Sequence, residues 1–155
     1  MTHQMLLQSL PEDPWDVVMV GFNILNQSAR NLFQQTLKKG VAVQIMFAVR
    51  RVLSQPEKLR EAVRALIEIG QIDAGEIDIS DPLGFLLKES DATSIVDAAY
   101  RFCRYEPGVH VVLSGTGNPD HLQSNIDSLC RPPLPDPVVR KLRHIFRHTD
   151  AITGQ

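Results

Sequence analysis

Short apolar runs alternate with amphipathic helical patterns along nearly the whole chain. Runs rich in β-branched residues predict three buried strands, over 16–22, 41–47 and 109–113. The last of these strands is expected to be covered on both faces. Apolar positions at helical spacing predict helices over 5–10, 28–39, 55–69, 93–105 and 138–148, with a further helix starting at 118. The pattern therefore predicts an α/β protein.

The strand–helix–strand–helix order indicates parallel strands joined by right-handed crossovers. It fits both an open doubly wound sheet and part of a closed barrel. No low-complexity stretch or linker divides the 155 residues, so we expect a single domain over 1–155. That length is short for a complete α/β barrel.

The turn after the third strand carries the clearest chemical signal. Gly115 and Gly117 permit backbone geometry and close approach that side chains would block. Asn118 is a good N-cap, Pro119 suits the first helical position, and Asp120 lies where the helix dipole favours negative charge. Amides at such a helix start bind anions, which predicts a phosphate-bearing ligand. A well-capped loop without a ligand has the same local pattern.

Two familiar phosphate motifs do not fit this turn. A P-loop needs Lys followed by Ser or Thr after its last glycine, and no such pair follows Gly117. The dinucleotide fingerprint of a doubly wound domain needs a third small residue where Asp120 stands. Barrels often bind phosphate at their final βα loops, so the turn favours part of a barrel.

Composition and charge narrow the functional classes only slightly. Hydrophobic residues make up 43% and charged residues 22%, which is the balance of an ordinary globular domain. The net charge of -2 gives no reason to expect nucleic acid or membrane as a partner. Without a transmembrane run or signal peptide, a cytoplasmic protein is expected. Cys103 and Cys130 lack metal-site spacing and are predicted to be free thiols, so no metal site is expected.

Four segments resemble the carboxy-terminal part of the aldo-keto reductase family, over roughly residues 13–146. They are DVVMVGFNILN (16–26), GVAVQIMFA (40–48), AAYRF (98–102) and LSGTGNPDHLQSNI (113–126), of which the last is the specific one. By this resemblance the chain is a partial (β/α)8 TIM barrel, about its last three strand–helix units plus a C-terminal helix. The resemblance implies hydride transfer between a nicotinamide dinucleotide, NADP or NAD, and a carbonyl or alcohol substrate.

By the resemblance, the glycine turn holds the adenosine phosphate of the cofactor. The matching residues are Gly115, Thr116, Gly117 and Asn118, with a threonine hydroxyl available to a phosphate oxygen. Many family members have a lysine where Gly115 stands and an arginine where His121 stands. Both departures weaken charge recognition of a 2′-phosphate, so NADP and NAD both stay open.

The resemblance assigns the rest of the cofactor to three further residues. Asn125 matches the residue that reads the adenine edge, Ser124 is its neighbouring contact, and Phe47 matches the aromatic ring that stacks on the nicotinamide. From spacing alone, Phe47 also fits a core position and Asn125 a capping or bridging role. Arg50 and Arg51, just past the second strand, fit either a contact with pyrophosphate or substrate, or a solvated loop.

The resemblance places no catalytic residue in this chain. The family's proton-donating tyrosine and its lysine, aspartate and histidine partners lie on earlier strands without a counterpart here. We therefore expect the chain alone to be inactive, and we expect it to be a fragment of a longer reductase. Two alternatives are a non-catalytic nucleotide-binding or assembly module, stable only as an oligomer, and an unrelated doubly wound domain with a phosphate ligand.

Three strands taken from a barrel leave unpaired backbone edges and apolar faces. Such edges favour pairing with another chain. Self-association through the open strand edges is therefore expected.

Overall fold

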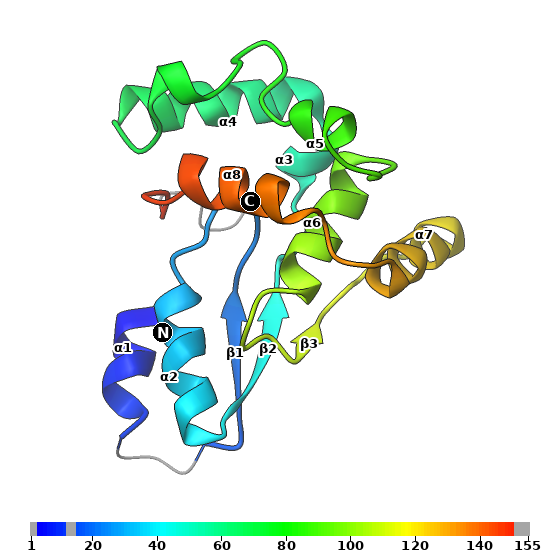
Figure 1. Cartoon of the computed structure of the whole chain (residues 1–155). Helices are drawn as coiled ribbons and strands as arrows, with labels where there is room; N and C mark the ends of the chain where they lie inside the picture. Colours follow the sequence, from blue (N-terminus) through cyan, green and yellow to red (C-terminus); the bar gives the residue numbers. More distant parts are fainter. Residues whose placement is uncertain (1–2, 12–14, 151–155) are drawn as a thin grey trace.

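The computed structural model describes residues 3–11 and 15–150 (Figure 1). Its elements in chain order are α1 (His3–Ser9), β1 (Val17–Gly21), α2 (Arg30–Lys39), β2 (Ala42–Met46), α3 (Arg51–Ser54), α4 (Pro56–Glu68), η1 (Ala74–Glu76), α5 (Phe85–Lys88), α6 (Ile95–Arg104), β3 (Val111–Val112), α7 (Pro119–Cys130) and α8 (Asp136–Ile145). This order confirms the α/β class and the order of the expected strands and helices, with shifted ends. The short helices α3, η1 and α5 lie where no helix was expected.

The three strands form one parallel sheet in the order β1-β2-β3. Val20 of β1 is in register with Ile45 of β2, which in turn is in register with Val112 of β3. Because the strands run in the same direction, their carboxyl ends meet at one edge of the sheet (Figure 1). The parallel strands and the helical crossovers agree with the sequence-based expectation.

The sheet is buried on one face and open on the other. Its buried face carries Val18, Val20, Val43 and Ile45. Its open face carries Val17 (54% exposed), Met19 (49%), Val111 (48%) and, just past β3, Leu113 (40%). The expectation that strand 109–113 is covered on both faces is therefore wrong. The strand is apolar on both faces, but no described element packs on the second face.

Two glycines fix the connections that bring the strands together. Gly40 ends α2 in the left-handed region (φ 70°), and its amide donates to the Leu37 carbonyl oxygen at 3.3 Å. Gly108, just before β3, has a φ of 91°, and a Cβ there would lie 2.9 Å from both the Cβ and the carbonyl oxygen of Phe33. A side chain at position 108 would push the approach to β3 away from α2.

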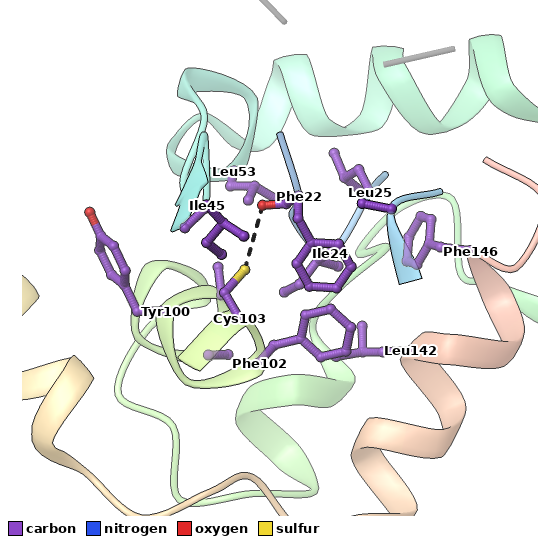
Figure 2. Close-up of a cluster of buried hydrophobic side chains, with 14 of the residues drawn as sticks. Phe22, Ile24, Leu25, Ile45, Leu53, Tyr100, Phe102, Cys103, Leu142 and Phe146 are labelled. Atoms are coloured by element: carbon purple, nitrogen blue, oxygen red, sulfur yellow. Dashed lines mark hydrogen bonds between the residues drawn. The ribbon is translucent and has the colours of Figure 1, made fainter. Parts of the chain in front are cut away.

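The hydrophobic core joins the end of β1 to α2, α6 and α8 (Figure 2). Phe22 meets Phe33 edge-on with ring centroids 5.0 Å apart, and it stacks on Phe102 at 5.7 Å. The Cys103 Sγ atom lies 3.7 Å from the Phe22 carbonyl oxygen, and burial raises the pKa of its thiol. Cys103 and the exposed Cys130 are both free, as expected.

A buried ion cluster fixes α6 to the segment that follows α7. Arg101 is 1% exposed and donates to the Asp91 carboxylate at 2.7 Å and to the Pro132 carbonyl oxygen at 2.8 Å. Arg131 donates to the carboxylates of Asp91 at 2.9 Å and Asp97 at 3.2 Å. These bonds hold the carboxyl end of α7 and thereby help to fix the position of that helix.

Helix α8 is fixed to the segment after β1 by polar contacts as well as by the core. The buried Gln27 side chain donates to the carbonyl oxygens of Ile24 at 3.0 Å and Leu142 at 3.1 Å. Glu106 accepts from Arg30 and from Arg143, each at 2.8 Å. Within residues 3–11 and 15–150, no helix is long and apolar enough to cross a lipid bilayer.

Candidate functional site

The candidate site lies at the carboxyl edge of the sheet, where the three strands end side by side. The Phe22 amide donates to the Met46 carbonyl oxygen at 3.2 Å, and the Leu113 amide donates to the Ile45 carbonyl oxygen at 2.9 Å. These bonds continue the backbone hydrogen bonding between the strands as far as their carboxyl ends. The parallel register then places Phe47, which follows β2, level with the turn that follows β3.

The turn holds its shape with hydrogen bonds made by its own polar side chains. The Thr116 hydroxyl accepts from the Asn118 amide at 3.1 Å. The Asn118 side chain accepts from the amides of Asp120 at 2.9 Å and His121 at 3.4 Å, which is the N-cap expected from the sequence. The first-turn amides of α7 are therefore already satisfied, and an anion there would have to displace Asn118.

The amides just before the cap remain available. Those of Gly115, Thr116 and Gly117 donate to no acceptor among the described residues. A Cβ added at Gly115 or Gly117 would meet nothing within 4 Å, and neither glycine has a left-handed backbone. Conformation does not require glycine at these positions, so the value of the two glycines is the open space beside three free amides. Such space suits the close approach of a phosphate.

Asn125 lies beneath the turn and connects α7 to α6. Its side chain is 9% exposed and donates to the Ser114 hydroxyl at 2.9 Å. That hydroxyl also lies 2.9 Å from the Tyr100 hydroxyl, which Figure 2 shows pointing away from the core. The sequence analysis gave no role to Ser114 or Tyr100. In this arrangement the amide nitrogen of Asn125 links α7 to the end of β3, and no described residue donates to its amide oxygen.

His121 and Ser124 lie on the exposed part of α7. The Ser124 hydroxyl donates to the Asp120 carbonyl oxygen at 3.0 Å, one turn earlier in the same helix. The His121 side chain forms no hydrogen bond within the part of the chain that the structure describes. Both side chains can reach a ligand bound outside the turn, and neither is fixed for that purpose.

Phe47 has an unusual backbone at the end of β2. Its φ is 65°, and no other non-glycine residue among those described has a positive φ. The Asn23 side chain donates to the Phe47 carbonyl oxygen at 3.2 Å, and a Cβ added at Gly21 would lie 3.5 Å from the Phe47 ring. Phe47 is 47% exposed. The alternative that Phe47 is a core residue, which its spacing allowed, is therefore wrong.

Other candidate chemistry lies away from this edge. A cavity of about 270 Å³ lies between α3, α4 and the start of α6, with Leu53, Leu59 and Leu83 among its lining, and none of the expected cofactor residues lines it. Within the described ranges, no group of three or more His, Cys, Asp or Glu side chains is arranged to hold a metal ion.

Of the eight expected cofactor residues, the structure gathers the turn and Asn125 around the end of β3, and register places Phe47 at the same edge. His121 and Ser124 lie on the helix that leaves this turn. The grouping can bind an extended anionic ligand with one end at the turn and an aromatic group at the Phe47 ring.

Comparison with known proteins adds a family and a fold. Residues 3–147 match the sequence model of the aldo/keto reductase family. The aldo-keto reductase AKR11C1 from Bacillus halodurans matches in its holo form with a TM-score of 0.63 and 15% identity, and in its apo form with 0.61 and 17%. Each match covers 100% of this chain and 50% of that chain. No match was found among curated proteins. The likeness establishes the fold and agrees with the expected partial (β/α)8 barrel.

Proposed function

Because the chain belongs to the aldo/keto reductase family, we propose that it is the cofactor-binding part of an NAD(P)-dependent reductase. In the whole reductase, hydride passes between the nicotinamide and a carbonyl or alcohol substrate. The chain spans half the length of the solved structures it matches, so this activity is proposed for the whole protein. Family membership argues against the alternative of an unrelated doubly wound domain.

The observation that carries the proposal is the turn between β3 and α7. Three consecutive amides lack acceptors among the described residues, and two glycines leave open space beside them. Asn125 bonds to Ser114, just before that turn, and the strand register places Phe47 level with the end of β3. Backbone amides, a threonine hydroxyl, an amide side chain and an exposed ring are together the groups that a dinucleotide needs.

We propose that the chain binds the cofactor without turning over a substrate. The Tyr100 hydroxyl is engaged with Ser114, and the Tyr105 hydroxyl donates to the Arg131 carbonyl oxygen at 2.9 Å. Among the described residues, neither hydroxyl bonds to a lysine, histidine or aspartate side chain that could activate it as a proton donor. A nucleotide-binding module without catalysis has the same site, so turnover by the isolated chain would contradict this part of the proposal.

The cofactor is proposed to be NADP or NAD, with little discrimination between them. Gly115 and His121 stand where many family members have a lysine and an arginine, and the His121 side chain forms no hydrogen bond among the described residues. A 2′-phosphate therefore gains little charge-assisted hydrogen bonding. We expect dissociation constants for NADPH and NADH within about tenfold of each other, a difference of about 1.4 kcal/mol.

The proposal is tested by calorimetric titration of the chain with NADPH and NADH. Gly117→Val places a side chain in the open space beside the free amides, where the fold tolerates it. The matched control is Gly75→Ala in η1, where a Cβ would lie 3.4 Å from the Asp73 carboxylate. We expect wild type and Gly75→Ala to bind equally, and Gly117→Val to bind at least about tenfold more weakly with unchanged stability. Equal binding by Gly117→Val and wild type would show that the turn is not the site.

A further inference from the structure

Three polar side chains link α6 and α7 to the end of β3. The Asn125 side-chain nitrogen donates to the Ser114 hydroxyl at 2.9 Å, and that hydroxyl lies 2.9 Å from the Tyr100 hydroxyl. An amide nitrogen can only donate, so the Ser114 oxygen is the acceptor of the first bond. The Ser114 proton is then left for the Tyr100 oxygen. This arrangement fixes one orientation of the Asn125 amide.

The Tyr100 hydroxyl is an unusual group on its face of α6. Tyr100 is 5% exposed, and its neighbours Ala98, Ala99 and Phe102 in the same helix are buried and apolar. A hydroxyl in such surroundings carries a desolvation cost unless it is bonded. Its partner is Ser114, and Figure 2 shows the hydroxyl pointing away from the core. The hydroxyl therefore serves the contact with Ser114, which the packing of α6 does not need.

The other end of the Asn125 amide is open. No described residue donates to its oxygen, and this oxygen is not among the fully buried side-chain atoms that lack a partner. It therefore reaches the surface as an acceptor. The neighbouring Ser124 hydroxyl donates to the Asp120 carbonyl oxygen at 3.0 Å and does not occupy the amide. A ligand beside Asn125 meets an acceptor, which selects a ligand group that donates.

Adenine and hypoxanthine differ at this kind of contact. Adenine carries an amino group at position 6, which donates, and hypoxanthine carries a carbonyl oxygen there, which accepts. An Asn125 oxygen that faces the base bonds to the amino group and repels the carbonyl oxygen. If the amide turned over, its nitrogen would face the base and the preference would reverse. The orientation of this one amide therefore decides which base fits.

We propose that Tyr100 and Ser114 are positioning residues that hold the Asn125 oxygen toward the base and thereby make the site selective for adenine over hypoxanthine. This inference rests on the proposed function, which puts the adenosine end of the dinucleotide at the turn between β3 and α7. Tyr100 and Ser114 act through Asn125 and need not touch the ligand. Without the Tyr100 hydroxyl, the Ser114 proton has no fixed acceptor and can be given to the Asn125 oxygen. The amide can then adopt either orientation.

The test is calorimetric titration of the 155-residue chain with NADH and with its analogue that has hypoxanthine in place of adenine. Tyr100→Phe and Ser114→Ala remove the two hydroxyls. The matched control is Tyr105→Phe, because the Tyr105 hydroxyl also forms one bond, to the Arg131 carbonyl oxygen at 2.9 Å. We expect wild type and Tyr105→Phe to bind NADH at least about tenfold more tightly than the analogue. In Tyr100→Phe and Ser114→Ala this ratio should fall to within about threefold.

The ratio of the two dissociation constants is the decisive readout, because a structural loss alone weakens both ligands alike. Equal binding of the two ligands by wild type, or an unchanged ratio in either variant, would overturn the inference and leave the proposed function standing. An equal fall of the ratio in Tyr105→Phe would overturn it too. If wild type binds neither ligand, the proposed function fails and the inference fails with it. Urea unfolding checks each variant, and Ser114→Ala, at a half-buried position, decides the question if Tyr100→Phe does not fold.

Discussion

At the scale of single residues, Phe47 shows strain where the fold has no need of it. A left-handed backbone at a bulky residue costs on the order of 1–3 kcal/mol. The Asn23 amide holds the Phe47 carbonyl oxygen in place, and the ring is nearly half exposed. Burial of the ring therefore offsets little of this backbone strain. Its position at the strand end favours a role in contacting a ligand.

Replacing Phe47 by asparagine separates stability from binding. Asparagine adopts the left-handed region readily, so we expect the free energy of unfolding to stay constant or rise by up to about 1 kcal/mol. Loss of the stacking ring should weaken NADH binding by about tenfold. Urea unfolding and calorimetry measure the two effects. A loss of stability above about 1 kcal/mol would show that the ring serves the core instead.

At the scale of elements, the Arg101 cluster links α6 to the chain after α7. Truncation to alanine leaves the buried Asp97 carboxylate, which is 2% exposed, with Arg131 as its remaining cationic partner. We expect Arg101→Ala to lower the free energy of unfolding by about 3–5 kcal/mol, as for other broken buried pairs. Arg104→Ala, at an exposed position of the same helix, should change it by less than about 0.5 kcal/mol. Similar effects of the two variants in urea unfolding would contradict this account.

The same cluster gives the chain an acid-sensitive link. Hydrogen bonds from Arg101 first, and from Arg131 second, hold the pKa of Asp91 below its ordinary value. Because the folded state favours the charged carboxylate, this stabilisation is present above about pH 4 and is lost as the pH falls through the lowered pKa. We expect Asp91→Asn to be less stable at neutral pH and to lose less stability than wild type between about pH 4 and pH 2. Parallel acid slopes in urea midpoints would contradict the assignment.

The sequence predicted the elements whose signals are local. The Asn118 cap and the Gly40 helix stop depend on neighbours a few residues away, and the structure bears them out. The exposure of Val111 could not be predicted, because an apolar run does not show whether a second layer is present. The Asn125–Ser114 contact joins two elements and has no local pattern.

At the scale of the whole molecule, the open face of the sheet is the dominant feature. Met19 lies in the middle of the outer strand β1 and is half exposed, and among the described residues no further strand pairs with β1 or β3. We expect self-association that grows with concentration, measured by light scattering against the 17.4 kDa mass of one chain. Met19→Lys should shift the chain toward the monomer. Leu87→Lys, at an exposed apolar position on α5, is the control and should not. A wild-type monomer at about 100 μM would contradict this prediction.

The central claim is that the turn between β3 and α7 holds the phosphate end of a nicotinamide dinucleotide. Hydrogen exchange with and without saturating NADPH tests it most directly, because it reports the amides themselves. The account predicts slower exchange at residues 115–117 and around Phe47, with little change in α4. Binding that leaves the amides of 115–117 unprotected, or protection confined to the cavity beside α4, would contradict it.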